Sequence, residues 1–115
     1  MLKTIPQLMS EINPDILCLD CEAAASQRRQ DNGLLVDVRE PSEYAEASVP
    51  GALNFPRGLL EMKMLAHQSD ESSPIYLHCA SAVRAKLAAE QLMRIGYNKV
   101  YVITGELSDI IRAHS

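Results

Sequence analysis

The chain has 115 residues, of which 47% are apolar, and a formal net charge of −4 at neutral pH. This length suits one domain with a single core, which we expect over residues 1–115. The acidic balance argues against nucleic acid and anionic membranes as partners. The sequence shows no apolar run near the roughly 20 residues of a membrane span and no signal-peptide pattern, so we expect a cytoplasmic protein.

Helical and strand patterns alternate along the chain. Thr4 and Asp20 are suitable N-caps for two of the helices, and Gly96 is a suitable C-cap for another. In chain order, the patterns predict a helix over 4–12, a buried strand over 16–19, a helix over 21–30, a strand over 34–38, a helix over 41–47, an extended piece over 52–55, a helix over 58–67, a strand over 75–78, a helix over 82–95, a strand over 100–103 and a helix over 106–113.

This alternation predicts an α/β fold with a parallel sheet covered on both faces by helices. In such folds, binding sites lie beyond the carboxyl ends of the strands. Asp37 and Cys79 both fall at predicted strand ends. We therefore expect them to share one site.

The most informative segment is the turn that follows the predicted strand over 75–78. Cys79 begins it, the small or uncharged residues Ala80, Ser81, Ala82 and Val83 follow, and Arg84 lies near the start of the next predicted helix. Backbone N–H groups in such a strand-to-helix turn can converge on an anion, and a thiolate is an anion. The plainer alternative is a buried structural cysteine.

Three segments carry a resemblance to the rhodanese-like sulfurtransferases. The run from Asp37 to Tyr44 resembles the family's Asp-x-Arg-x-x-x-Glu-Phe/Tyr segment, and the run from Val49 to Pro56 resembles its Ile-Pro-Gly-Ala-x-Asn-x-Pro turn. The run from Cys79 to Arg84 matches its Cys-x4-Arg loop. The resemblance implies a rhodanese-like three-layer α/β/α fold with a mostly parallel sheet of about five strands.

The resemblance also implies roles for particular residues. Cys79 would take sulfane sulfur from a small donor, thiosulfate or a persulfide, and pass it to a thiol or protein acceptor. Arg84 would orient the donor, and the amides of residues 80–83 would hold the sulfur anion. Asp37 and Arg39 would support the loop as an ion pair at the strand end. We expect no cofactor and no metal.

The chain departs from the family pattern at several positions. Ala82 stands where the family loop usually has glycine, which costs on the order of 1 kcal/mol if the backbone there has a positive φ. No Lys or second Arg lies between Cys79 and Arg84. The loop therefore offers little charge to a dianion, and a persulfide donor fits it at least as well as thiosulfate.

Two other functions are open from the sequence. One is a non-catalytic rhodanese-like binding or regulatory module. The other is a related cysteine phosphatase or arsenate reductase, but those enzymes place five residues between Cys and Arg, whereas Cys79 and Arg84 are separated by four.

Two further features of the sequence need an interpretation. Cys18 and Cys21 have the spacing of a redox pair, but without a second such motif we interpret them as structural thiols. His78 precedes Cys79 in the strand, so its side chain is expected on the opposite face, as a core or supporting residue.

Overall fold

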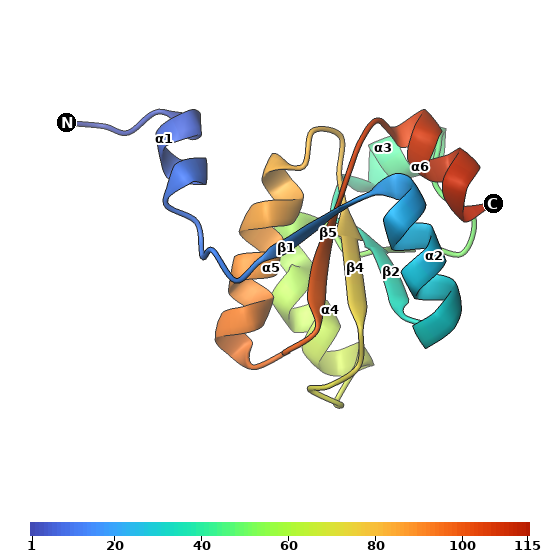
Figure 1. The fold of residues 1–115 in the computed structure, drawn as a ribbon. Helices are drawn as coiled ribbons and strands as arrows, with labels where there is room; N and C mark the ends of the chain where they lie inside the picture. The colour runs from blue at the N-terminus through green and yellow to red at the C-terminus, as the bar shows by residue number, and fades with distance from the viewer.

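The computed structural model describes residues 1–115 and contains a five-stranded sheet in the order β1-β5-β4-β2-β3 (Figure 1). Every neighbouring pair of strands is parallel. The strands are β1 (Leu17–Asp20), β2 (Leu34–Asp37), β3 (Leu53–Asn54), β4 (Ile75–His78) and β5 (Val100–Thr104). The fold is therefore the predicted α/β class, with an all-parallel sheet.

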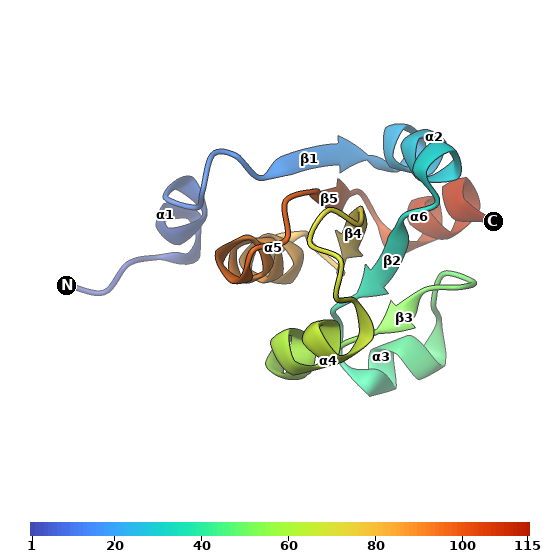
Figure 2. The ribbon, with the colours of Figure 1, turned by 90° about the horizontal axis from the view of Figure 1, so that it is seen from below.

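Helices cover both faces of this sheet and make three layers. α2 and α6 pack together on one face, and α4 and α5 lie on the other (Figure 2). The helices are α1 (Ile5–Ser10), α2 (Cys21–Asp31), α3 (Pro41–Glu46), α4 (Leu60–His67), α5 (Val83–Ile95) and α6 (Leu107–His114), with a 3-10 turn at Arg57–Leu59 before α4. None of these helices combines the length and the apolar character that a membrane span requires.

The two faces of the sheet carry separate hydrophobic clusters because side chains alternate along each strand. In β4, Leu77 joins the cluster that includes residues of α4 and α5. Tyr76 joins the cluster that includes residues of α2 and α6. Cys79 belongs to the α4/α5 cluster, so the residue directly before it, His78, faces the other layer.

The expected caps are present. Thr4 forms a capping box with Gln7 at the start of α1. The side chain of Asp20 accepts a hydrogen bond from the N–H of Ala23 at 2.7 Å. Gly96 ends α5 with a φ of 131°, a backbone conformation that favours glycine.

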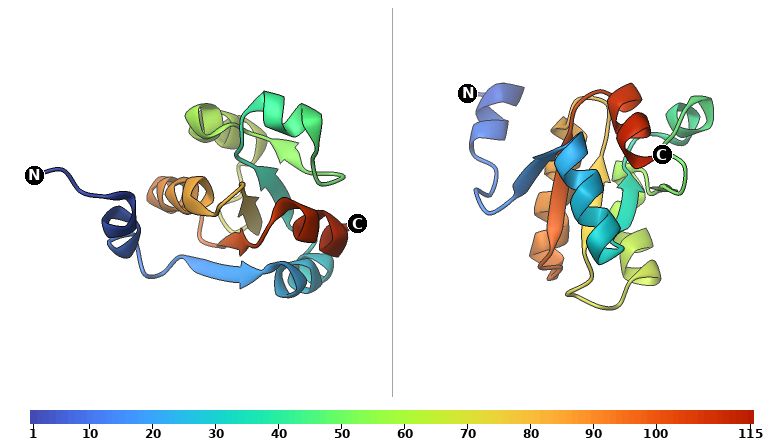
Figure 3. Two further views of the ribbon diagram at one scale, coloured as in Figure 1. Left: turned by 90° about the horizontal axis from the view of Figure 1, so that it is seen from above. Right: turned by 45° about the vertical axis from the view of Figure 1, so that its right-hand side comes forward.

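One prediction about burial in the N-terminal region was wrong. β1 was expected to be a buried strand, yet Leu17 and Cys18 are exposed because β1 is an edge strand that pairs only with β5. α1 has an apolar stripe, but none of its residues is buried. The helix stands apart from the three layers, at the end of the chain opposite α6 (Figure 3).

Candidate active site

Asp37 and Cys79 lie where the chain changes direction across the sheet. From β2 the chain passes outward to β3, and from β4 it passes outward to β5 on the other side. A crevice at the carboxyl ends of two such strands is the usual binding position in open parallel sheets. Asp37 ends β2 and is paired in register with His78, which ends β4, so the sheet brings the two predicted segments together.

The thiol of Cys79 lies at the base of the loop before α5. Cys79 is 1% exposed, and its Sγ accepts a hydrogen bond from the backbone N–H of Ala85 at 3.3 Å. The sequence suggested the amides of residues 80–83 for this contact, whereas the N–H that reaches the sulfur belongs to the first turn of α5. An N–H donor at this distance stabilises a negative charge on sulfur.

Ala82 has the strained backbone that we considered because the family loop usually has glycine at this position. Its φ is 68° and its ψ is −13°, in the left-handed region, and it is the residue before α5. An alanine there costs on the order of 1 kcal/mol relative to glycine. The chain therefore keeps the sharp turn between Cys79 and α5 in spite of the methyl group.

Arg84 is held by a carboxylate from a distant part of the chain. Its Nη1 donates to Oε1 of Glu43 at 2.7 Å and its Nη2 donates to Oε2 at 3.1 Å. The hydrogen bond from Arg84, followed by one from the backbone of Glu40, lowers the pKa of Glu43 to about 2. The sequence alone indicated no role for Glu43, although it lies in the first segment that resembles the rhodanese pattern.

Asp37 and Arg39 form a buried ion pair, as the sequence suggested. Nε and Nη2 of Arg39 donate to the Asp37 carboxylate at 2.7–3.0 Å, and Nη2 also donates to the carbonyl of Ala47. Both side chains are nearly inaccessible, at 0% and 6% exposure. Asn54 of β3 donates to the carbonyls of Asp37 and Arg39, so both side-chain and backbone hydrogen bonds hold the chain at the end of β2.

The rhodanese-like domain model matches residues 21–113, which is most of the chain. The chain belongs to the family of rhodanese-like domains. A sulfurtransferase of Allochromatium vinosum is 38% identical over 82 residues, which cover 70% of this chain and 75% of that protein.

Two further relatives show a similar likeness. The uncharacterized protein YqhL of Bacillus subtilis is 35% identical over 62% of this chain, and the putative sulfur carrier protein YrkF of the same organism is 33% identical over 65%. The chain spans only 55% and 40% of the length of these two relatives.

Solved structures show the same rhodanese fold. An Escherichia coli rhodanese with anions has a TM-score of 0.61 and 28% identity, over 68% of this chain and 91% of that one. RPA3614 of Rhodopseudomonas palustris, described as a possible tyrosine phosphatase, has a TM-score of 0.80 over 98% of this chain and 92% of that one. At 23% identity, the second likeness concerns the fold alone.

The other two cysteines of this rhodanese-like chain lie away from the Cys79 loop. Cys18 is exposed on the edge strand β1, and Cys21 is partly buried at the first position of α2. Both are free thiols. β1 is separated from β4 by β5, and Cys18 and Cys21 form no hydrogen bond with Cys79.

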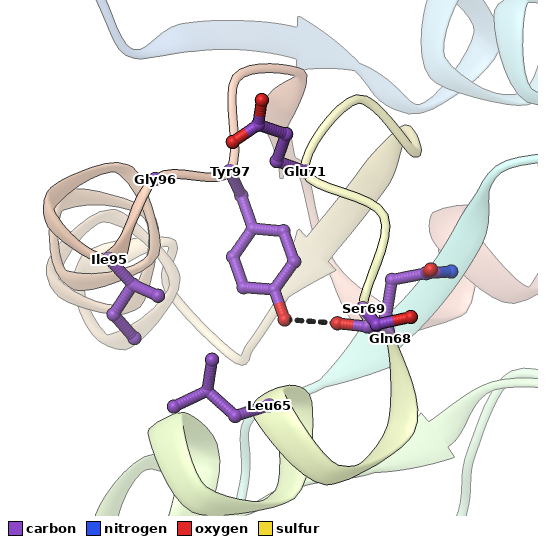
Figure 4. Close-up of a pocket in the computed structure, with 7 residues that line it drawn as sticks. All are labelled: Leu65, Gln68, Ser69, Glu71, Ile95, Gly96 and Tyr97. Carbon is purple, nitrogen blue, oxygen red and sulfur yellow. Dashed lines mark hydrogen bonds between the residues drawn. The ribbon is translucent and has the colours of Figure 1, made fainter.

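The largest cavity lies at the other end of the sheet. It has a volume of about 310 Å³ and is lined by residues that include Leu65, Ile95 and Tyr97 (Figure 4). Its walls come from the segments that lead into β4 and β5, whereas Cys79 follows the carboxyl end of β4. The cavity therefore belongs to the opposite side of the rhodanese-like domain.

His78 is a buried histidine without a hydrogen-bond partner on either imidazole nitrogen. Its Nε2 lies 3.9 Å from Oδ2 of Asp37. Burial is the main cause that lowers the pKa of His78 to about 4. The negative charge of Asp37 raises this pKa, whereas Arg39 and His114 lower it further. The histidine is therefore neutral in the folded protein at neutral pH.

Acid should destabilise the rhodanese-like domain through His78. The unfolded chain binds this proton near the ordinary pKa of about 6.5, so full stability is expected above that pH and is lost as the pH falls toward 4. The loss from this group should approach about 3 kcal/mol, measured by urea unfolding at a series of pH values.

Substituting His78 tests how much of the stability lost in acid is due to this residue. His78→Leu, which removes the titrating group, should reduce the slope of the curve between pH 6.5 and 4, and burial of His114, whose pKa is also lowered, should leave a smaller slope. His67→Gln, at an exposed histidine, should leave the curve as in the wild type. An unchanged curve in His78→Leu would assign the acid sensitivity to other groups.

Proposed function

We propose that the chain is a sulfurtransferase that carries sulfane sulfur on Cys79 as a persulfide and passes it to a thiol. The observation that carries this proposal is the single hydrogen bond from the N–H of Ala85 to Sγ of Cys79, at the carboxyl end of a central strand. The similarity to the Allochromatium sulfurtransferase and to the putative sulfur carrier of Bacillus supports the same chemistry.

The reaction divides into two displacements at sulfur. The Cys79 thiolate attacks the sulfane sulfur of the donor, a new S–S bond forms, and the old bond breaks with its electron pair on the leaving group, sulfite from thiosulfate or a thiolate from a persulfide. An acceptor thiolate then attacks the outer sulfur, takes it as a new persulfide and restores the Cys79 thiolate. No external oxidant or reductant enters the balance.

The residues around Cys79 have separate tasks in this scheme. The N–H of Ala85 and the N-terminal end of α5 would stabilise the negative charge on Sγ. The outer sulfur lies about 2 Å beyond Sγ, and the amides of residues 80–83 would receive it there. Because Cys79 is only 1% exposed, this extension would also bring the transferable sulfur closer to the acceptor.

Incubation with a sulfur donor tests the proposal directly. After thiosulfate or an alkyl persulfide is removed, intact-mass measurement should show one adduct of about 32 Da, the mass of one sulfur atom, which dithiothreitol removes. Peptide mapping should place the adduct on Cys79. If neither donor gives an adduct on Cys79, the chain is not a sulfur carrier, and the alternative of a non-catalytic binding module is preferred.

A phosphatase assay tests the alternative that the chain is a cysteine phosphatase. The four residues between Cys79 and Arg84 make a tighter loop than the phosphatase loop, and Arg84 is occupied by Glu43. We therefore expect no hydrolysis of p-nitrophenyl phosphate. Hydrolysis that depends on Cys79 would contradict the proposed function.

A further inference from the structure

The charge beside the Cys79 loop is decided by a carboxylate that sequence analysis left without a role. Glu43 lies on α3, and its two oxygens accept hydrogen bonds from the two terminal nitrogens of Arg84 at 2.7 and 3.1 Å. The hydrogen bond with Glu43 is the main cause that raises the pKa of Arg84, and Cys79 and Asp37 contribute smaller electrostatic attractions. Arg84 therefore sits within electrostatic range of the sulfur while it is paired with Glu43.

Glu43 is itself fixed in place. Its Oε1 also accepts a hydrogen bond from the N–H of Glu40 at 2.9 Å, as part of a capping box at the start of α3. Pro41 at the first position of that helix restricts the backbone further. The carboxylate is thus presented to Arg84 by a preformed turn, and it is 35% exposed against 33% for Arg84.

The pairing leaves the loop without net positive charge. Residues 80–83 carry no charge, and the other guanidinium of the site, that of Arg39, is neutralised by Asp37. An incoming donor therefore meets one partly exposed guanidinium group, that of Arg84, which is paired with Glu43, while the Arg39–Asp37 pair is buried. The Coulomb energy of a donor with such a site grows in proportion to the donor's charge. A dianion gains less here than at a site with a free arginine.

We propose that Glu43 is a specificity-determining positioning residue that orients Arg84 and cancels its charge, so that the site selects singly charged sulfane donors, such as alkyl persulfides, over dianionic thiosulfate. The inference rests on the proposed sulfurtransferase function. Donor charge is the property that it predicts.

Two donors that transfer the same sulfur atom but differ in charge can test this proposal. Thiosulfate and methanethiosulfonate both deliver one sulfane sulfur, with sulfite or methanesulfinate as the leaving group, but thiosulfate carries two negative charges and methanethiosulfonate one. The variant is Glu43→Gln, which keeps an oxygen acceptor for Arg84 and Glu40 and removes the charge. The matched control is Glu46→Gln, which removes the charge of an exposed carboxylate one turn farther along α3.

The expected result is a change in donor preference. Because thiosulfate carries twice the charge, its gain in Coulomb energy should be twice that of methanethiosulfonate, and its rate factor should be the square. If kcat/KM for methanethiosulfonate rises about twofold in Glu43→Gln, kcat/KM for thiosulfate should therefore rise about fourfold, mainly through KM. The excess for thiosulfate should shrink as ionic strength rises. Glu46→Gln should keep the donor ratio of the wild type.

Several outcomes would overturn the inference. Equal factors for the two donors, or a fall in both, would reduce Glu43 to a structural role. The same shift in Glu46→Gln would assign the effect to the general surface charge. A steep fall in thiosulfate turnover by the wild type on adding salt would show an uncancelled positive site, and this measurement does not depend on how the variant folds.

The proposed function can fail separately. Absence of sulfur on Cys79 with both donors, in wild type and variant, would overturn the sulfurtransferase proposal and the selectivity with it. Sulfur on Cys79 with an unchanged donor ratio would overturn the role of Glu43 alone.

Discussion

Replacing Cys79 with serine is expected to lower kcat/KM for sulfur transfer by more than about a thousandfold. A serine hydroxyl is not ionised at neutral pH and cannot hold a transferable sulfur as a persulfide. The buried position and the N–H of Ala85 would be retained, since oxygen replaces sulfur with little change in volume. The measurement is steady-state transfer from thiosulfate or an alkyl persulfide to a thiol, with circular dichroism to confirm the fold.

The two remaining cysteines provide matched controls for Cys79→Ser. Cys18 lies on the edge strand and Cys21 at the start of α2, so Cys18→Ser and Cys21→Ser should change kcat/KM by less than about twofold. Loss of transfer in Cys21→Ser together with retention in Cys79→Ser would move the chemistry to the Cys18–Cys21 pair.

Asp37→Asn is expected to destabilise the fold by about 3–5 kcal/mol. The substitution leaves the guanidinium of Arg39, which is only 6% exposed, without its carboxylate partner in the interior. A buried charge without a partner is far more costly than the loss of an exposed ion pair. Urea unfolding at neutral pH measures the change in the free energy of unfolding.

A second substitution distinguishes the unpaired charge from a packing defect. Adding Arg39→Met to Asp37→Asn removes the buried charge and should recover part of the lost free energy of unfolding. If Asp37→Asn costs less than about 1 kcal/mol, water or another group satisfies Arg39, and the ion pair does not anchor the end of β2.

Local patterns in the sequence predicted most of the elements. The strand over 75–78 has the observed bounds, and the helix before Gly96 begins one residue later than expected. These features depend on neighbours a few residues apart, such as the hydrogen bond between Asp20 and Ala23. The Asp37–Arg39 ion pair could also be predicted from the sequence because its members are two residues apart.

Burial at the edge of the fold could not be predicted in the same way. The apolar residues of β1 resemble those of a central strand, but their exposure depends on the position of β1 in the sheet order. The apolar stripe of α1 likewise predicts a helix and does not reveal whether another element covers it.

The sequence by itself determined the alternation of strands and helices, the family resemblance and the cysteine at the end of a strand. Only the tertiary structure paired Glu43 with Arg84, which are 41 residues apart, and directed the N–H of Ala85 to the sulfur. The physical reason is that a strand or a cap is specified by nearby residues, whereas the charge of a site depends on which segments the sheet brings together. For this protein, that pairing turns an apparently free arginine into a neutralised one.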